Sequence, residues 1–402
     1  MLIGVLGGGQ LGMMMAQAGE PLGMKFRFLD PSPESPAASC GEHIIAPYED
    51  KAALAAFARG LDFATWEFEN VPCETVRRLA DRVTVRPAAA LLELAQDRLA
   101  EKRVFQEIGL QPARHLPVSS LADLEGAVRE LGTPCILKTR RMGYDGKGQF
   151  FLREREDVAK AWAELGQGKP GIELILEGFV EYEREVSLIA CRGVGAGTSP
   201  DRANTHGQTV FYPMSTNVHR GGILRVARVG DGFEVAPELE REARGAVARL
   251  LELFGYVGVL TVEFFVVNRF GGGQMLVANE MAPRVHNSGH WTIEGVGRGS
   301  GHKGGGASQF ENHVRAIAGM PLGSGEMNAP GAAMVNIVGE APDEEAARAI
   351  PGATLHMYGK SPRAGRKLGH LTIVGDRETV DRGVAAATKI AGMREGQSPA
   401  IE

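Results

Sequence analysis

A glycine-rich loop near the N-terminus constrains the fold of this chain more than any other feature. The short apolar run Leu2–Leu6 leads directly into Gly7-x-Gly9-x-x-Gly12, and a helical stretch, Leu11–Ala18, follows. Glycines in this arrangement allow a tight turn between a strand and a helix, and they bring backbone N–H groups and the helix N-terminus towards an anion. The loop therefore predicts that the chain begins with an α/β unit.

The same loop matches the fingerprint of dinucleotide-binding folds, because Asp30 follows at the end of the strand predicted at Lys25–Leu29. A close strand–helix packing turn that binds no cofactor explains the same residues. The pattern indicates NAD only weakly, and both interpretations stay open at this point.

Strands and helices continue to alternate through the first hundred residues. The strand predicted at Phe63–Trp66 lies between helices predicted at Lys51–Arg59 and Glu74–Leu79, and a longer helical stretch, Ala88–Ile108, precedes Pro112. This alternation predicts a doubly wound parallel sheet with helices on both faces. A length of 402 residues favours two or three domains. We expect boundaries that give domains 1–111, 112–325 and 326–402.

Composition excludes several classes of function. The net charge of −5 provides no global basic field to recruit nucleic acid. The four cysteines lie far apart with no CxxC pair, which argues against a zinc site or a disulfide framework and fits a reducing compartment. No apolar run approaches the ~20 residues that a membrane span requires. We expect a cytoplasmic protein that binds neither nucleic acid nor membrane.

A second glycine-rich loop, Arg140–Gly148, separates two predicted strands. Lys138 ends the first strand and Lys147 lies in the loop, so the segment combines positive charge with a backbone that can approach phosphate oxygens. It is not a Walker A motif, because the GK[ST] ending is missing. A solvated hairpin is the alternative, but the strand–loop–strand setting favours nucleotide phosphates.

Two carboxylates, Glu263 and Glu280, lie in neighbouring apolar stretches that we predict to be strands. A hairpin centred between Gly271 and Gly272 places the two side chains opposite each other. Like charges in that position are destabilising, and burying them costs several kcal/mol each. A divalent cation removes the conflict, and Mg²⁺ is commonly held by one or two carboxylates plus nucleotide phosphates. The alternative is an outward-facing, solvated pair.

The segment 283–291 carries His286 and His290, which on a helix would suggest a zinc pair. Pro283 and Gly289 argue against that helix, and no third ligand is apparent. A polar loop that suits a substrate is the better interpretation.

The segment 358–370 carries four cations within eight residues, in a turn shaped by glycine and proline: Lys360, Arg363, Arg366 and Lys367. Such a cluster is often a solvated face, but here a phosphate cradle is at least as good an interpretation.

Together, these motifs resemble the ATP-grasp superfamily and, within it, the 5-(carboxyamino)imidazole ribonucleotide synthases of purine biosynthesis. The resemblance covers residues 1 to about 375, and it is carried by GGGQLGMM, TWEFENVP, QDRLAEK, KTRRMGYDGKGQ, EREVSLI, VFYPMSTNVHRGGILR, NEMAPRVHNSGHW and RAGRKLGHL. It implies an N-terminal doubly wound parallel-sheet (pre-ATP-grasp) domain, a central α+β ATP-grasp domain, a small C-terminal domain and a homodimer. It also implies a reaction in which ATP activates bicarbonate as carboxyphosphate and aminoimidazole ribonucleotide is carboxylated.

The resemblance further implies roles for the residues that match the family's motifs. ATP would be held by Arg98, Lys138, Gly143, Tyr144, Asp145, Gly146, Lys147, Gly148, Gln149, Glu177, Gly178, Phe179, Val180, Glu185, His219, Asn279 and Glu280. Mg²⁺ would be held by Glu263 and Glu280. The ribonucleotide and bicarbonate would contact Gly9, Gln10, Leu11, Glu67, Glu69, Arg284, Asn287, Lys360, Arg366 and Lys367. Catalysis would rest on Arg284, Lys138 and Glu280.

Two departures from the family pattern stand out. The segments Gly193–Thr205 and Gly295–Gly306 are longer than usual, which predicts lengthened surface loops, and Ala282 replaces an asparagine that many ATP-grasp enzymes carry. Three alternative functions also stay open. A formate-using glycinamide ribonucleotide transformylase shares the nucleotide residues, an NAD-dependent reductase leaves Glu263 and Glu280 unexplained, and a non-catalytic ADP-binding module is the least favoured.

Overall fold

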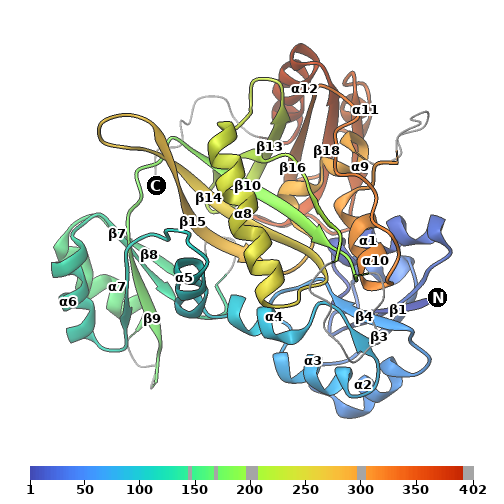
Figure 1. The fold of residues 1–402 in the computed structure, drawn as a ribbon, viewed down its shortest axis with the longest axis horizontal. Coiled ribbons are helices and arrows are strands. Elements are labelled where there is room, and N and C mark those ends of the chain that lie inside the picture. The colour runs from blue at the N-terminus through green and yellow to red at the C-terminus, as the bar shows by residue number, and fades with distance from the viewer. Residues whose placement is uncertain (144–146, 167–170, 196–206, 297–304, 393–402) are drawn as a thin grey trace.

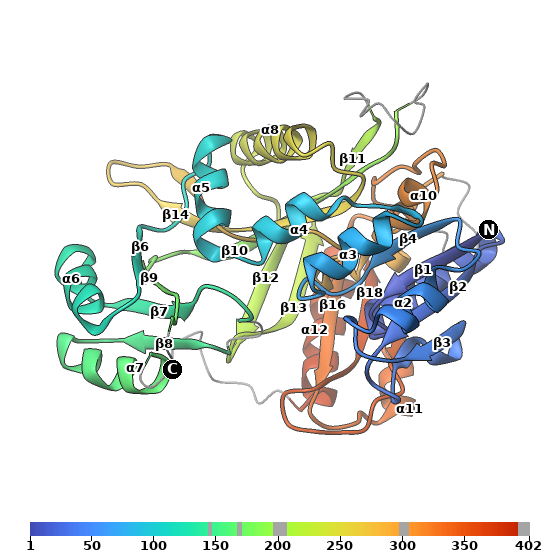
Figure 2. The same cartoon turned by 90° about the horizontal axis from the view of Figure 1, so that it is seen from below.

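The computed structural model describes residues 1–143, 147–166, 171–195, 207–296 and 305–392, and these ranges contain three β-sheets. The sheet of the N-terminal region and a small four-stranded sheet lie at opposite ends, with the largest sheet between them (Figure 1, Figure 2). No helix in these ranges is both long enough and apolar enough to cross a membrane.

The N-terminal sheet is parallel, with strand order β3-β2-β1-β4-β5. Its elements are β1 (Leu2–Leu6), α1 (Gln10–Gly19), β2 (Lys25–Asp30), β3 (Glu42–Ile45), α2 (Lys51–Ala58), β4 (Phe63–Trp66), α3 (Cys73–Ala80) and β5 (Thr84–Val85). Ile3 and Val5 pack with α1 on one face, whereas Leu6 and Leu29 pack with α2 and α3 on the other. The predicted doubly wound arrangement is confirmed.

The single helix predicted at Ala88–Ile108 is wrong, because the structure has two helices there: α4 (Ala89–Ala95) and α5 (Arg98–Glu107). Asp97 begins the second helix by accepting hydrogen bonds from the backbone N–H groups of Leu99 at 3.1 Å and Ala100 at 3.4 Å. The first N–H groups of a helix have no backbone partner within the helix, and an N-cap side chain accepts their hydrogen bonds. Asp97 therefore marks the start of a new helix. The apolar pattern continues through this break, so periodicity alone hides it.

The four-stranded sheet has the order β6-β9-β7-β8 and is antiparallel throughout. Its elements are β6 (His115–Val118), α6 (Leu121–Leu131), β7 (Cys135–Thr139), β8 (Gln149–Leu152), α7 (Val158–Leu165) and β9 (Leu174–Gly178). β7 and β8 form the predicted strand–loop–strand unit around the second glycine loop. Tyr144, Asp145 and Gly146 of that loop lie outside the described residues.

The largest sheet is antiparallel and includes strands from both the central and the C-terminal regions, in the order β15-β14-β10-β12-β13-β16-β18-β17, with β11 beside β10. Its strands are β10 (Arg184–Arg192), β11 (Thr209–Phe211), β12 (Ser215–Arg220), β13 (Ile223–Gly230), β14 (Gly258–Asn268), β15 (Gln274–Ala282), β16 (Gly331–Val338), β17 (Ala353–Met357) and β18 (Lys367–Gly375). The helices of this region are α8 (Pro237–Leu253), α9 (Thr292–Gly295), α10 (Gln309–Ile317), α11 (Glu344–Arg348) and α12 (Arg377–Ile390). Because β13 pairs with β16, the C-terminal strands extend the central sheet and form no sheet of their own.

The hairpin of β14 and β15 differs from the symmetric one that we predicted. Asn268 pairs with Gln274, which centres the turn on Gly271. A bulge between Val262 and Phe264 then shifts the pairing by one residue, so that Phe264 lies opposite Ala278 but Val262 lies opposite Met281. A bulge sets one residue against two and bends the strand. The two segments that we predicted as long loops fall largely within residues 196–206 and 297–304, which lie outside the described ranges.

Candidate active site

A buried cluster of charges joins the four-stranded sheet to the rest of the molecule. Lys138 on β7 reaches Glu177 on β9 with Nζ 2.9 Å from Oε2, and Lys102 on α5 reaches Oε1 of the same carboxylate at 3.1 Å. Burial alone would raise the pKa of Glu177, but Lys102 and Lys138 outweigh it and hold that pKa well below its usual range. Glu177 is therefore ionised and fixes both ammonium groups at one edge of the site.

Arg98 connects this cluster to β15 and to the second glycine loop. Its Nη1 lies 3.4 Å from Oε2 of Glu280, and its Nη2 lies 3.5 Å from the carbonyl oxygen of Gly143. The root of the loop is anchored by Asp97, whose Oδ2 accepts Nη2 of Arg140 at 2.5 Å. The capping residue of α5 thus also fixes where the loop leaves β7.

The described part of the glycine loop has the geometry that its glycines predict. Gly148 has a φ of +70°, and a Cβ there would lie 2.7 Å from Oγ1 of Thr139, so a side chain is excluded. Its carbonyl oxygen accepts the N–H of Thr139 at 2.8 Å, which closes the loop on β7. Lys147 and Gln149 are exposed beside it. Across the sheet, Gly178 ends β9 and Phe179 and Val180 continue from it.

Glu185 on β10 and His219 on β12 form a pair farther along the large sheet. His219 Nδ1 lies 2.6 Å from Oε2 of Glu185, and the Tyr182 hydroxyl donates to Oε1 at 2.8 Å. Burial would lower the pKa of His219, but the bond to Glu185 and its charge outweigh this and raise the pKa to about 9. The charges of Glu263 and Glu280 act on the same imidazole, so these residues share one site.

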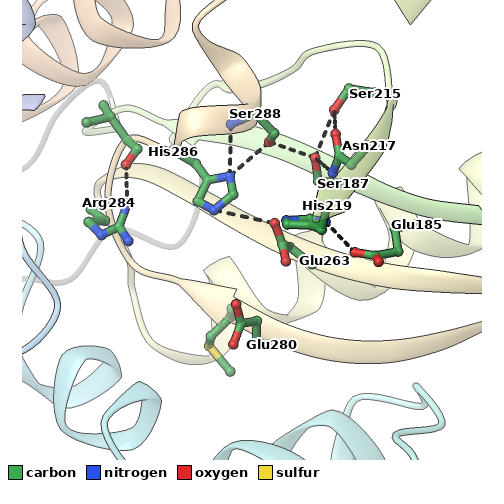
Figure 3. Close-up of polar contacts among 12 residues, drawn as sticks. Glu185, Ser187, Ser215, Asn217, His219, Glu263, Glu280, Arg284, His286 and Ser288 are labelled. Atoms are coloured by element: carbon green, nitrogen blue, oxygen red, sulfur yellow. Dashed lines mark hydrogen bonds and ion pairs between the residues drawn. The ribbon is translucent and has the colours of Figure 1, made fainter. Parts of the chain in front are cut away.

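Glu263 and Glu280 lie on adjacent strands at the bulge (Figure 3). Glu263 is buried, and burial together with the charge of Glu280 raises its pKa to about 8. The described residues bring no three His, Cys, Asp or Glu side chains together as a metal site. Two carboxylates that repel each other suit a cation that takes its remaining ligands from phosphates and water, as Mg²⁺ does. Asn279, next to Glu280 on β15, accepts Nζ of Lys102 on its carbonyl oxygen at 3.3 Å.

The backbone N–H groups of the first glycine loop are already taken by a protein side chain, and this overturns the interpretation of the loop as a dinucleotide fingerprint. Glu67, which follows β4, accepts the N–H of Gly9 at 2.5 Å on Oε1 and the N–H of Gly12 at 2.7 Å on Oε2. A Cβ on Gly9 would lie 2.5 Å from Oε1 of Glu67. Asp30 is likewise occupied, because its Oδ2 accepts the N–H of Gly8 at 2.9 Å. The glycines make room for a protein carboxylate.

Predicted substrate residues gather beside this loop. Lys360 donates to Oε1 of Gln10 at the start of α1, and Arg284 forms an ion pair with Glu69, which follows β4. The loop after β17 and the loop after β15 therefore both reach the N-terminal region. The charge of Lys367 acts on Glu69 as well.

Three further predicted substrate residues, Asn287, Arg366 and Leu11, differ in their hydrogen bonding and packing. Neither amide atom of Asn287 has a hydrogen-bond partner among the described residues, although both atoms are buried. Arg366 holds its own turn through Ser361, with Nη1 2.9 Å from Oγ. Leu11 packs its side chain into the core, which leaves only its backbone for a ligand.

Arg284 lies between the two groups of residues. The charges of Glu69, Glu67 and Glu280 all act on its guanidinium and, against the effect of burial, raise its pKa above the ordinary value. Arg284 therefore lies between residues predicted to bind the nucleotide and residues predicted to bind the substrate.

Sequence reasoning missed two residues of this site. Lys102, only 1% exposed, was present in the segment QDRLAEK but was not singled out. His286 was noted only as part of a polar loop, yet its Nε2 lies 3.4 Å from Oε1 of Glu263. His290, by contrast, packs against Phe310 and His370 in the interior, so the two histidines do not form a zinc pair.

Comparison with known protein families divides the chain into three parts. Residues 1–96 match the ribonucleotide synthetase preATP-grasp domain, residues 103–298 the ATP-grasp domain and residues 332–381 the phosphoribosylaminoimidazole carboxylase C-terminal domain.

Similar proteins and structures agree with these matches. The chain is 46% identical to the N5-carboxyaminoimidazole ribonucleotide synthase of Pseudomonas aeruginosa, over 96% of this chain and 98% of the relative. The crystal structure of the synthetase from Thermus thermophilus has a TM-score of 0.86 at 44% identity, covering 98% of this chain and 100% of that one. A synthase from Aspergillus clavatus, solved with ADP and 5-aminoimidazole ribonucleotide, has a TM-score of 0.82 at 26% identity, covering 98% and 99%.

Proposed function

This chain belongs to the family of N5-carboxyaminoimidazole ribonucleotide synthases, and we propose how its residues perform the family's reaction. It is an ATP-dependent ligase of purine biosynthesis that carboxylates aminoimidazole ribonucleotide. The observation that carries the assignment of roles is the position of Arg284, which forms an ion pair with Glu69 on one side and interacts with the charge of Glu280 on the other. We assign the nucleotide to one group and the ribonucleotide to the other.

The nucleotide side comprises the cluster around Glu177 and the paired carboxylates. Lys138 and Lys147 lie at the two ends of a loop whose glycines let backbone approach phosphate oxygens, and Arg98 adds a third positive charge. The ATP-binding set is the one inferred from the sequence: Arg98, Lys138, Gly143–Gln149, Glu177–Val180, Glu185, His219, Asn279 and Glu280. Glu263 and Glu280 are the residues that would hold Mg²⁺, which when bound neutralises charge on the transferred phosphoryl group.

The ribonucleotide side comprises Glu67, Glu69, Asn287, Lys360, Arg366 and Lys367. Arg366 and Lys367 suit the phosphate of a ribonucleotide, because charge-assisted hydrogen bonds to phosphate are strong. The unpartnered amide of Asn287 is left for a polar group of the substrate. Gly9, Gln10 and Leu11 contribute through the loop that Glu67 holds in place.

Bicarbonate fits beside Arg284, between the two sides. Its carbon is a poor electrophile, and transfer of the γ-phosphoryl group from ATP to a bicarbonate oxygen creates carboxyphosphate with a good leaving group. The exocyclic amine of the ribonucleotide then attacks the carboxyl carbon, phosphate leaves and the amine loses a proton. Arg284 would hold the carboxyl group of bicarbonate and then of carboxyphosphate. Lys138 would neutralise charge on the transferred phosphoryl group, and Glu280 would act there through the Mg²⁺ that it holds. Positioning and charge neutralisation are most of what phosphoryl transfer requires.

The domain division, the oligomeric state and the cellular location belong to the same proposal. The domain division 1–111, 112–325 and 326–402 is close to the family matches, although β16–β18 share a sheet with the central region. A homodimer and a cytoplasmic location are supported by resemblance to the family and by its place in purine biosynthesis.

The test is an ADP-release assay with bicarbonate and Mg²⁺, run with aminoimidazole ribonucleotide, with glycinamide ribonucleotide and formate, or with neither. We expect ADP release above background only with aminoimidazole ribonucleotide. Release that requires glycinamide ribonucleotide and formate would assign the chain to the transformylase type instead. Release that depends on neither would contradict the proposed acceptor.

A further inference from the structure

A row of buried polar side chains runs across the large sheet and ends at Glu263. The pairing of β10 places Ser187 opposite Ser215 of β12 on one side and opposite Glu263 of β14 on the other. Both serines are only 1% exposed. The loop after β15 brings Ser288, which is fully buried, over the same row (Figure 3).

The hydrogen bonds of this row fix the tautomer of His286. The backbone N–H of Ser288 points at Nδ1 of His286 from 3.3 Å, and since a backbone amide can only donate, Nδ1 carries no proton. The Ser288 hydroxyl, 2.8 Å from the same nitrogen, must then also donate to it. A neutral imidazole has one N–H, so the proton lies on Nε2. That atom faces Oε1 of Glu263 at 3.4 Å.

The remaining bonds give the row a single direction. Because the Ser288 proton is directed to His286, its oxygen accepts the proton of Ser187, 2.7 Å away. Ser187 in turn accepts Nδ2 of Asn217 at 3.0 Å. Ser215 Oγ lies 2.9 Å from Ser187 Oγ and 3.1 Å from Oδ1 of Asn217, so Ser215 contacts the row at Ser187. Because a hydroxyl has one proton, Ser187 cannot donate to both Ser288 and Ser215, and reversing its bond to Ser288 would take the Ser288 proton away from Nδ1 of His286.

We propose that Ser288 and Ser187 are positioning residues for this reaction: through the directed row they hold His286 as the Nε2–H tautomer, so that its N–H fixes the Glu263 carboxylate in the orientation that binds Mg²⁺. The opposite tautomer would turn a nitrogen lone pair towards the carboxylate and repel it. Residues that orient a metal ligand in this way commonly change metal affinity or activity by about 10–100-fold when they are removed. The proposal rests on the proposed role of Glu263.

The first test is a long-range ¹H–¹⁵N correlation spectrum of ligand-free protein labelled with ¹⁵N-histidine, with the His286 signals assigned by their loss in His286→Gln. We expect a single Nε2–H tautomer in the wild type and a mixture in Ser288→Ala. An Nδ1–H tautomer or an imidazolium in the wild type would overturn the proposal. Because the spectrum needs no substrate, it stands even if the ADP-release assay refutes the proposed acceptor.

The second test is the Mg²⁺ dependence of ADP release. Ser288→Ala should raise the apparent KM for Mg²⁺ by about 10-fold and Ser187→Ala by less, with the KM for the ribonucleotide unchanged. Ser288→Thr, which keeps the hydroxyl, should recover most of the effect. Thr261→Val is the matched control, because it removes a buried hydroxyl from β14, two residues from Glu263, that has no hydrogen-bond partner among the described residues. An unchanged KM for Mg²⁺ in Ser288→Ala and Ser187→Ala, or an equal rise in Thr261→Val, would overturn the proposal.

Discussion

The Glu67 carboxylate lies against the N-terminus of α1, where its Oε2 accepts the backbone N–H of Gly12 at 2.7 Å. This is the position in which dinucleotide-binding folds place a pyrophosphate. A side chain from the end of the neighbouring strand β4 therefore occupies the anion site that the glycine loop creates.

The first prediction follows from this contact. NAD(H) should not bind, because its pyrophosphate would have to displace Glu67 from the N–H groups of Gly9 and Gly12. Titration calorimetry with NADH and, separately, with Mg²⁺–ATP measures both affinities. Micromolar affinity for NADH without affinity for ATP would refute the assignment of the nucleotide site.

The second prediction concerns the paired carboxylates. Glu280→Gln and Glu263→Gln should each reduce Mg²⁺-dependent turnover by about 100-fold or more, since each deletes a proposed metal ligand, not merely a supporting residue. Both variants should stay folded, because each change relieves the repulsion between Glu263 and Glu280. Turnover is measured by ADP release at saturating Mg²⁺, with thermal unfolding as the folding control. Wild-type turnover in either variant would refute the metal assignment.

The third prediction is a pH dependence of stability. The pKa of Glu263 is raised from 4.5 to about 8 in the folded protein, by burial first and by Glu280 next. Between these values the native state binds more protons than the unfolded state, so this carboxyl lowers the free energy of unfolding as pH rises. The slope from one group is at most about 1.4 kcal/mol per pH unit. The contribution is complete above pH 8.

Urea denaturation between pH 5 and pH 8.5, without Mg²⁺ or nucleotide, checks this prediction. Glu263→Gln cannot lose a proton, so its unfolding free energy should fall less steeply with pH than that of the wild type. Glu101, whose pKa is also raised to about 8, is present in both proteins and cancels in the comparison. Parallel profiles would show that Glu263 titrates normally.

The fourth prediction concerns the cations of the segment 358–370. Arg366→Ala and Lys367→Ala should each raise the KM for the ribonucleotide by about 10-fold or more and leave the KM for ATP nearly unchanged. A charge-assisted hydrogen bond contributes roughly 1.5–3 kcal/mol. Arg363→Ala is the matched control, because Arg363 is an exposed cation of the same turn. An equal rise in the KM for both substrates would place these cations elsewhere.

Much of the fold was predictable because its signals are local. The strands β1 and β4 begin and end where the apolar pattern places them. The break before α5 was missed, because Asp97 interrupts no apolar pattern and acts through its side chain. The bulge at Glu263 was missed for a related reason. The predicted pairing of β14 and β15 came from counting equal numbers of residues on both sides of the turn, and such a count cannot detect an extra residue in one strand.

A site residue was predictable where it belongs to a recognisable sequence motif. It was not predictable where its role depends on buried contacts with residues far away in the sequence. Lys102 lies 177 residues from Asn279, whose carbonyl oxygen it contacts, and no pattern in one sequence links such a pair. The tautomer of His286 likewise depends on Ser187 and Ser288 from separate elements. Contacts of this kind become visible only when the strands are paired.

The most direct test of the central claim follows an oxygen atom. If ATP phosphorylates bicarbonate at Arg284, one bicarbonate oxygen ends in the released phosphate, whereas phosphorylation of the ribonucleotide would leave bicarbonate oxygen out of it. The measurement is mass spectrometry of phosphate released from ¹⁸O-labelled bicarbonate, with a correction for exchange between bicarbonate and water. The account predicts ¹⁸O-labelled phosphate in a reaction that requires aminoimidazole ribonucleotide. Unlabelled phosphate would contradict carboxyphosphate as the intermediate.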